Sequence, residues 1–249
     1  MTPGTRRALA QERSQGLAQE LPVVPRATYR LQFHRGFRFD DATAILPYLA
    51  RLGVSHVYAS PILASRPGST HGYDLVDYES INPELGGEAA FLRFCDALTA
   101  HGLALVVDIV PNHMAVGGHG NHWWQSVLEW GRASAHARAF DIDWSRRDAH
   151  GKLILPILDA PYGEALERGE LKLAFDSQRG SLFIRCGEHV LPLSLESYGA
   201  ILSDAASKSA RGLKEVEDRL REAAREASLC RKAASGEKLK RRLVELAAR

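Results

Sequence analysis

The chain has 249 residues, of which 45% are hydrophobic and 25% are charged, a composition that excludes disordered and collagen-like proteins. Lysine and arginine number 32 against 30 acidic residues, so the net charge of +2 predicts neither a nucleic-acid-binding nor a membrane-surface protein. Cys95, Cys186 and Cys230 are widely spaced and odd in number, which excludes a disulfide framework and favours the reducing cytoplasm. Residues 1–25 form a polar leader without the apolar core of a secretory signal.

Residues 26–120 are expected to alternate strands with helices. In chain order the sequence predicts a strand over Ala27–Phe33, a helix over Ala42–Leu52, a strand over Val54–Ala59, a long loop over Ser60–Gly87, a helix over Ala89–His101 and a strand over Leu103–Val110. Asp40 and Asp41 offer an N-cap to the first helix. The nearly continuous apolar run of Leu103–Val110 indicates a strand buried on both faces. Strands separated by helices predict right-handed crossovers and a parallel α/β sheet, either a barrel or an open sheet.

The alternation stops after residue 120, and residues 121–206 are expected to form an inserted subdomain. It would begin with a helix over residues 121–133 and contain an antiparallel meander over Leu171–Phe175, Leu182–Cys186 and Val190–Leu193, turning at Gly180 and Gly187. Residues 207–249 are predicted to be an amphipathic helical segment, formed by two helices that are interrupted near Ser235 and Gly236. Its charged residues indicate a solvated face, and a coiled coil is the alternative.

Polar residues follow the predicted strands at the end where parallel α/β folds bind ligands. Tyr73 beside Asp74 supplies an aromatic face and an adjacent acceptor, which suits the apolar face and the hydroxyl groups of a sugar ring. Asp108 ends an apolar strand, where a carboxylate is costly unless it is paired. A purely structural role for Asp108, as a cap or loop staple, is the alternative.

Four histidines raise the question of a metal site. They are His71, His113, His119 and His122, and the last two have the spacing of one helical face. No cysteine or third ligand at metal spacing completes the set. We therefore expect neither a metal site nor a cofactor.

Several motifs resemble those of the alpha-amylase superfamily, glycoside hydrolase family 13. The motif DIVPNH at 108–113 is similar to that family's third-strand motif, and SPILASRPGSTHGYDLVDYESINPELGG at 60–87 is similar to its loop after strand two. More narrowly, TYRLQF at 28–33, NHWWQSVLEWG at 121–131, FDIDW at 140–144 and LILPILDAPYGEALERGELKL at 153–173 resemble the maltooligosyl trehalose synthase family. The resemblance covers about residues 27–204.

The resemblance implies a (β/α)₈ barrel acting on the reducing end of maltooligosaccharides or other α-glucans. Such enzymes convert the terminal α-1,4 linkage into an α,α-1,1 linkage by intramolecular transglucosylation, which is a step of trehalose biosynthesis. It also implies a set of substrate-binding residues, with Tyr73 stacking on a glucosyl ring. The others are His71 and Asp74 in the same pocket, His113 on the ring, Asp108 supporting the pocket, and Asn112, whose alternatives are a calcium ligand and a structural asparagine.

Retaining transglucosylation needs two carboxyl groups about 5–5.5 Å apart. The family's motifs for them, after the fourth and fifth strands, do not occur here, since Arg146-Arg147-Asp148 lies in a polar stretch rather than after an apolar strand. We therefore expect the catalytic carboxylates beyond Arg249, and the chain to be an amino-terminal piece with about three barrel strands that is inactive alone. A non-catalytic carbohydrate-binding remnant and a family 13 α-glucan hydrolase are the alternatives. The sequence specifies no oligomeric state, and leaves both core and sugar-platform roles open for Trp123 and Trp124.

Overall fold

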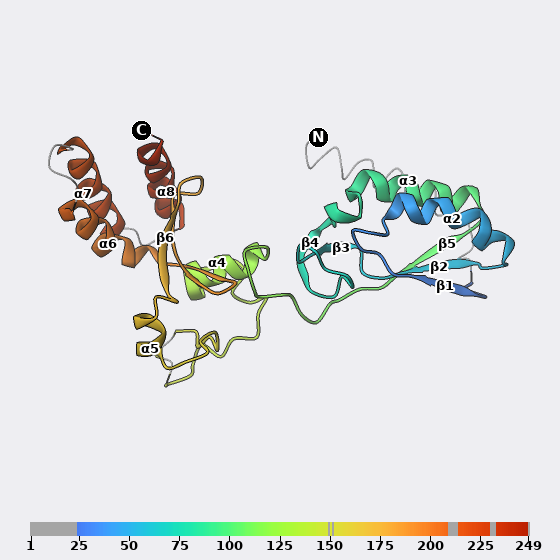
Figure 1. The fold of residues 1–249 in the computed structure, drawn as a ribbon, viewed down its shortest axis with the longest axis horizontal. Coiled ribbons are helices and arrows are strands. Elements are labelled where there is room, and N and C mark those ends of the chain that lie inside the picture. The colour runs from blue at the N-terminus through green and yellow to red at the C-terminus, as the bar shows by residue number, and fades with distance from the viewer. Residues whose placement is uncertain (1–23, 149, 151, 209–213, 230–232, 249) are drawn as a thin grey trace. The chain divides into compact units, whose positions relative to one another are not determined.

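The computed structural model describes residues 24–148, 150, 152–208, 214–229 and 233–248 (Figure 1). The described chain divides into two compact units. The first contains the residues up to Asp74 together with Tyr78–Asn112, and the second contains Leu75–Asp77 and the residues from His113 onward. All but two residues of the predicted leader, and Cys230, lie outside the described residues.

A three-stranded parallel sheet forms the centre of the first unit, as the alternation of strands and helices predicted. Its order is β1 (Thr28–Leu31), β2 (His56–Ala59) and β5 (Ala104–Val107). The crossovers are α2 (Phe39–Arg51) and α3 (Gly87–Ala100). Leu31 is aligned with Ala59, and Ala59 with Val107, so the three strands end at the same level.

The two helices cover one face of this sheet (Figure 1). Leu46 and Leu49 of α2 and Phe94 of α3 are completely buried, and they pack with Val57 of β2 in one core. This spacing of apolar residues is what fixes the helices against the strands. The residues of the strands that point away from this core are therefore the ones that can form a site.

The first helix begins differently from the prediction. Asp40 and Asp41 lie inside the first turn of α2, which starts at Phe39 and is preceded by Arg38. The carboxylate of Asp41 accepts a hydrogen bond of 2.8 Å from the backbone N–H of Arg38. An acidic side chain in the first turn accepts from an unpaired backbone N–H, and its negative charge interacts favourably with the positive end of the helix dipole. Asp41 therefore stabilises the start of the helix from the third helical position.

The prediction of one long loop over Ser60–Gly87 is wrong, because this segment contains two strands. β3 (Leu63–Ser65) pairs with β4 (Leu75–Ile81), and a 3₁₀ turn follows at Pro83–Leu85. β3 has only three residues, and the two strands flank a stretch rich in glycine, serine and proline, which hides their pairing in the sequence. The pairing brings the residues between them, including Tyr73, back towards the ends of the parallel strands.

The expectation that the third parallel strand is buried on both faces is also wrong. All four residues of β5 are only partly buried, and Ile109 just beyond it is 68% exposed. Among the described residues β5 pairs with β2 alone, so it is an outer strand of the sheet. An apolar run predicts burial on both faces only for a strand that lies between two neighbouring strands.

The second unit combines a small antiparallel sheet with helices. Its elements are α4 (His122–Trp130), a 3₁₀ turn (Gly131–Ala133), α5 (Tyr162–Glu167), β6 (Lys172–Asp176), β7 (Ser181–Cys186), β8 (His189–Pro192), α6 (Leu195–Lys208), α7 (Lys214–Leu229) and α8 (Ala233–Ala247). The predicted meander is confirmed, with the order β6-β7-β8 and turns at Gly180 and Gly187. Tyr198 of α6 is fully buried, its hydroxyl accepts a 2.7 Å bond from Leu182 N–H, and burial raises the pKa of Tyr198 to about 12.

The helical part departs from the prediction in two ways. Helix α6 begins at Leu195, before the segment that was predicted to be helical, and was not expected. Ser235 and Gly236 lie within α8 instead of between two helices. Gly236 is buried, and a Cβ there would overlap the side chains of Leu195 and Trp130. The glycine is therefore required by close packing rather than by a helix end. No helix in the described ranges is long and apolar enough to span a bilayer.

Candidate functional site

The register of the parallel strands sets three polar residues side by side. Gln32, Ser60 and Asp108 are each the first residue after a strand, following the aligned strand ends of β1, β2 and β5. Backbone hydrogen bonds extend this alignment past the strand ends. Ser60 N–H donates to the carbonyl oxygen of Leu31 at 3.0 Å, and Asp108 N–H donates to that of Ala59 at 2.9 Å. The carboxyl end of the sheet is therefore a fixed platform rather than three independent loops.

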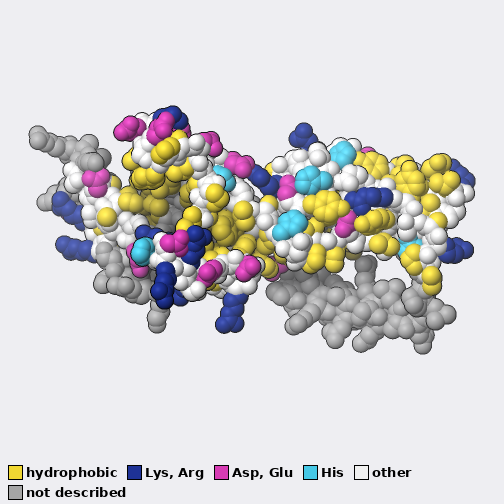
Figure 2. Space-filling model, turned by 90° about the horizontal axis from the view of Figure 1, so that it is seen from below, with side chains coloured by type: hydrophobic (Ala, Val, Ile, Leu, Met, Phe, Trp, Pro, Cys, Tyr) yellow, Lys and Arg dark blue, Asp and Glu magenta, His cyan; other side chains and the backbone are white. Residues whose placement is uncertain are grey.

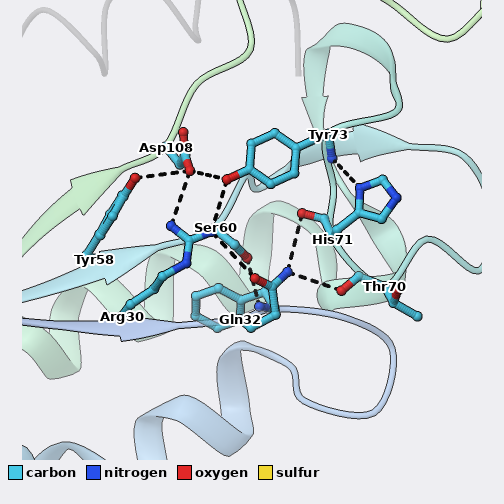
Figure 3. Close-up of polar contacts among 9 residues, drawn as sticks. Arg30, Gln32, Tyr58, Ser60, Thr70, His71, Tyr73 and Asp108 are labelled. Atoms are coloured by element: carbon cyan, nitrogen blue, oxygen red, sulfur yellow. Dashed lines mark hydrogen bonds and ion pairs between the residues drawn. The ribbon is translucent and has the colours of Figure 1, made fainter.

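Arg30 and Tyr58 stand beside Asp108 on the sheet face opposite the helices (Figure 3). Arg30 is aligned with Tyr58 on the neighbouring strand, and its guanidinium lies 4.7 Å from the centre of the tyrosine ring. Its Nη1 donates to Asp108 Oδ2 at 3.2 Å, and the Tyr58 hydroxyl donates to the same oxygen at 3.1 Å. Two strands thus hold the carboxylate that follows the third.

Tyr73 completes the group from the segment between β3 and β4. Its hydroxyl donates to Asp108 Oδ2 at 2.5 Å and accepts a bond of 3.0 Å from Arg30 Nη2. The tyrosine is 36% exposed, so its phenol end is held while part of the ring reaches solvent. We call Arg30, Tyr58, Tyr73 and Asp108 the tyrosine–aspartate cluster.

The segment that carries Tyr73 is tied to the sheet by backbone and side-chain bonds. Gln32 Nε2 donates to the carbonyl oxygens of Thr70 and His71 at 3.1 and 3.3 Å (Figure 3). Gly72 has a φ of +79°, and a Cβ there would lie 2.7 Å from the carbonyl oxygen of Pro61. Only glycine fits such a conformation and such a close approach, so the glycine before Tyr73 fixes the direction of its ring.

Asp74 serves the same segment from within. Its Oδ1 accepts a bond of 2.5 Å from the Ser69 hydroxyl, whose oxygen in turn accepts a bond of 3.1 Å from Gly72 N–H. Asp74 is thus committed to the turn that precedes Tyr73. Asp74, which the sequence predicted as a substrate-binding residue, therefore stabilises the turn next to the cluster.

His71 lies against Tyr73, with ring centres 6.0 Å apart and planes inclined by 22°. Its Nδ1 accepts a bond of 3.0 Å from Tyr73 N–H. A ring nitrogen that accepts a hydrogen bond carries no proton, so this bond is made by the tautomer with its proton on Nε2. The 3.9 Å contact between His71 Nδ1 and Asp74 is therefore not an ion pair in this tautomer.

The bonds within the cluster favour its charged form. The Tyr73 hydroxyl bond, followed by those of Arg30 and Tyr58, lowers the pKa of Asp108 below 3.8 against an opposing effect of burial. The same bond to Asp108 raises the pKa of Tyr73 above 10.0, since an ionised phenol would face a carboxylate. One anion and one cation face each other, so the cluster is neutral overall at pH 7.

One oxygen of Asp108 takes all of these donors. Among the residues that the structure describes, Tyr58, Tyr73 and Arg30 all reach Oδ2. The side chain of Asp108 is 18% exposed. An ionised carboxylate accepts at both oxygens, so Oδ1 has the capacity to accept from a ligand.

The structure thus brings together Tyr73 and Asp108, with His71 and Asp74 next to them. Asn112 and His113 are both exposed in the segment after β5, and His113 belongs to the second unit. Sequence reasoning missed Arg30, Gln32 and Tyr58. The available signal was a cation in the middle of a predicted strand, followed two residues later by the polar Gln32.

The other predicted features belong to the second unit. Within the described ranges no three histidine, cysteine or acidic side chains are grouped to hold a metal. Trp123 stacks on His136 with ring centres 5.0 Å apart, and Trp124 packs against Phe140 at 5.1 Å. Both tryptophans are half-buried. Each ring is therefore engaged with an aromatic neighbour in this unit.

A cavity of about 570 Å³ in the second unit is lined mainly by apolar side chains. The lining residues that define it are Phe175, Leu182, Leu202, Leu220, Leu243 and Leu246. It carries no group of polar side chains comparable to the cluster. This cavity therefore offers mainly apolar contacts, in contrast to the polar cluster at the end of the parallel sheet.

Comparisons with known proteins point in one direction. The profile of the alpha amylase catalytic domain matches residues 40–150. A putative maltooligosyl trehalose synthase of Mycobacterium tuberculosis is 45% identical over 166 residues, which are 61% of this chain and 21% of the relative. Over the matched residues this chain is similar to the alpha-amylase superfamily. Tyr58, Tyr73 and Asp108 of the cluster lie within the matched residues 40–150, and Arg30 precedes them.

Solved structures of maltooligosyl trehalose synthases are also similar to this chain. A crystal structure of a maltooligosyl trehalose synthase matches with a TM-score of 0.63 and 39% identity, over 68% of this chain and 22% of that protein. The maltooligosyltrehalose synthase of Arthrobacter ramosus matches with a TM-score of 0.60 and 40% identity, over 68% and 21%. The chain spans about a fifth of the length of these proteins. A fold of the barrel type follows for this α/β chain.

Proposed function

We propose that this chain supplies a glucan-binding part of an enzyme of the maltooligosyl trehalose synthase type. Such an enzyme rearranges the reducing-end α-1,4 linkage of a maltooligosaccharide to an α,α-1,1 linkage. The observation that carries the proposal is the cluster, in which a partly exposed Tyr73 ring stands next to an ionised Asp108 with one oxygen not used by the described donors. The similarity to maltooligosyl trehalose synthases supports the choice of substrate.

The chemistry of the cluster suits a neutral sugar. An aromatic ring packs against the C–H face of a pyranose, and a carboxylate oxygen accepts from its hydroxyl groups. Arg30 and Asp108 neutralise each other, so the cluster does not select for a charged ligand. On the face drawn in Figure 2, acidic and basic side chains are interspersed, which also favours recognition by local contacts over long-range attraction.

The remaining assignments are part of the same proposal. β1, β2 and β5 would be the first three strands of a (β/α)₈ barrel, within residues 26–120, followed by an insertion over 121–206 and a helical segment over 207–249. His71, Asp74 and His113 would line the glucosyl site, and Asn112 would have a structural role. The widely spaced cysteines support a cytoplasmic location.

We assign binding rather than bond breaking to the cluster. A retaining transglucosylase needs a nucleophilic carboxylate and a second carboxyl group about 5–5.5 Å away, and it must exclude water so that a sugar hydroxyl attacks the intermediate. Asp108 accepts from three side chains through one oxygen, and these bonds stabilise a fixed anion. A carboxylate held in this way is suited to orienting a sugar.

A titration with maltopentaose tests the proposal. We expect the methyl and amide NMR signals of the first unit near Tyr73 to shift on addition of maltopentaose, and the shifts to disappear in Y73A. The matched control is Y48A, because Tyr48 is 55% exposed on α2 and outside the cluster. Equal binding by Y73A and the wild type would refute the assignment of Tyr73.

The products distinguish the remaining alternatives. Incubation of the chain with maltopentaose should leave the reducing ends unchanged if its role is binding. Accumulation of a non-reducing product would show that the chain carries out the rearrangement itself. Release of glucose or shorter maltooligosaccharides would instead identify it as an α-glucan hydrolase.

A further inference from the structure

Arg30, like Asp108, contacts all three of the other residues of the cluster, and it does so as the donor. Its Nη1 donates to Asp108 at 3.2 Å, its Nη2 donates to the Tyr73 hydroxyl at 3.0 Å, and its plane lies 4.7 Å from the centre of the Tyr58 ring. A guanidinium has several donors in a rigid fork and stacks on aromatic rings, which an ammonium cannot do in the same way. The site therefore uses the features that are particular to arginine.

The position of Arg30 in the fold makes this contact rigid. It lies within β1, aligned with Tyr58 of β2, whereas Tyr73 is carried by the segment between β3 and β4. A third bond, of 3.5 Å, joins Arg30 Nη2 to the side-chain oxygen of Gln32, which itself holds the backbone of Thr70 and His71. The arginine thus links the rigid sheet to the segment that bears the aromatic ring.

We propose that Arg30 is a positioning residue of the glucan site, which fixes the Tyr73 ring and the Asp108 carboxylate in the single arrangement that a glucosyl unit binds. The inference rests on the proposed function and adds a residue to it. Without the arginine, Tyr73 would retain one bond to Asp108 and could rotate about it, so binding would have to order the site. Arg30 acts through these two side chains and does not itself need to touch the sugar.

The test compares R30Q and R30K with the wild-type chain and with the control R93Q. Arg93 is an exposed arginine of the same unit, paired with Asp40 at 2.9 Å on the helical side. We expect R30Q to bind maltopentaose about tenfold more weakly, as loss of a hydrogen bond to a charged group implies. R30K should bind nearly as weakly, because one ammonium cannot bridge both partners and stack as well. R93Q should bind like the wild type.

A second measurement separates positioning from folding. The carboxyl carbon of Asp108, followed by NMR as the pH is lowered, should titrate at a higher pKa in R30Q than in the wild type, because a bond to the carboxylate is lost. R30K should keep a pKa closer to the wild-type value, since the positive charge remains. Weak binding together with this near-normal titration in R30K would identify geometry as the contribution of Arg30.

Three results would overturn the inference. They are wild-type affinity in R30Q, full recovery of affinity in R30K, which would reduce the role to charge, and an unchanged Asp108 titration in R30Q. If the wild-type chain does not bind maltopentaose at all, the proposed function fails. The titration of Asp108 in R30Q still decides in that case whether Arg30 holds the cluster together.

Discussion

Replacing Asp108 with asparagine tests the energetics of the cluster most directly. The change keeps the size of the side chain and an oxygen that accepts, but removes the negative charge. Hydrogen bonds to charged groups contribute about 1.5–3 kcal/mol, against about 0.5–1.5 kcal/mol between neutral groups, so each of the three bonds should weaken by about 1 kcal/mol. The Arg30 and Asp108 side chains are 37% and 18% exposed, and solvent reduces the expected sum to about 1–2 kcal/mol in the free energy of unfolding.

The loss of stability in D108N should depend on pH in a defined direction. The folded-state pKa of Asp108 lies below the 3.8 of an unperturbed aspartate. The stability it contributes is therefore fully present above that unperturbed value and is lost as the pH falls through the lower folded value. We expect D108N to be less stable than the wild type by a constant amount between pH 7 and about 5, and the difference to shrink below about pH 4.

The assay has to report on the first unit alone. All four tryptophans lie in the second unit, at positions 123, 124, 130 and 144, so their fluorescence follows that unit. Urea unfolding should instead be followed through NMR signals of buried Val57 and Leu46. The matched control is D96N, because Asp96 is an exposed aspartate of α3. Equal stability of D108N and wild type at pH 7, or a difference that persists at pH 2, would refute the reasoning.

Three further predictions concern packing. G72A should destabilise the first unit by about 1–3 kcal/mol and weaken maltopentaose binding, because an alanine cannot adopt this φ without strain; unchanged Val57 unfolding would contradict it. G236A should lower the midpoint of urea unfolding, measured by tryptophan fluorescence, because the added Cβ overlaps neighbouring side chains. The control G163A should not, because the space around its Cβ position is open. Equal midpoints for G236A and wild type would show that α8 shifts at no cost. K240M should destabilise the second unit by about 3–5 kcal/mol, because it leaves the half-buried Glu129 without the lysine that lies 2.6 Å away. The double variant K240M/E129M should recover most of the lost stability. Absence of this recovery would mean that packing, and not the ion pair, dominates.

The parallel sheet could be predicted because its signals are local and repeated. The apolar spacing of Leu46, Leu49, Phe94 and Leu98 marks the two helices, and the strands between them are apolar and bounded by glycines. The meander of β6-β7-β8 was found for a similar reason, since Gly180 and Gly187 mark its turns. Periodicity identifies elements that pack one face against a core.

The elements that sequence reasoning missed depend on contacts between distant residues. β3 is short and is separated from β4 by a turn-rich segment, so their pairing has no local signature. Gly236 looks like a helix end in the sequence, and only the approach of Trp130 and Leu195 explains it. A glycine that admits a neighbour cannot be told from a glycine that ends a helix without the partner in view.

The candidate site was predicted in part. Tyr73 and Asp108 were found from residue type and position after predicted strands, and the structure places them 2.5 Å apart. Arg30 was not found, because its role depends on register, with Tyr58 beside it and Asp108 beyond the end of the third strand. Register follows from the pairing of whole strands and cannot be obtained from any single motif.

The cluster draws its four members from one compact unit, the part of the described chain that ends at Asn112. Every hydrogen bond that orients Tyr73 and Asp108 among the described contacts is made within that unit. Mutational tolerance should therefore be uneven along this sequence. We expect substitutions in the meander and in helices α6 to α8 to leave the arrangement of the cluster unchanged, so that the proposed glucan binding would stay constant while the second unit diversifies.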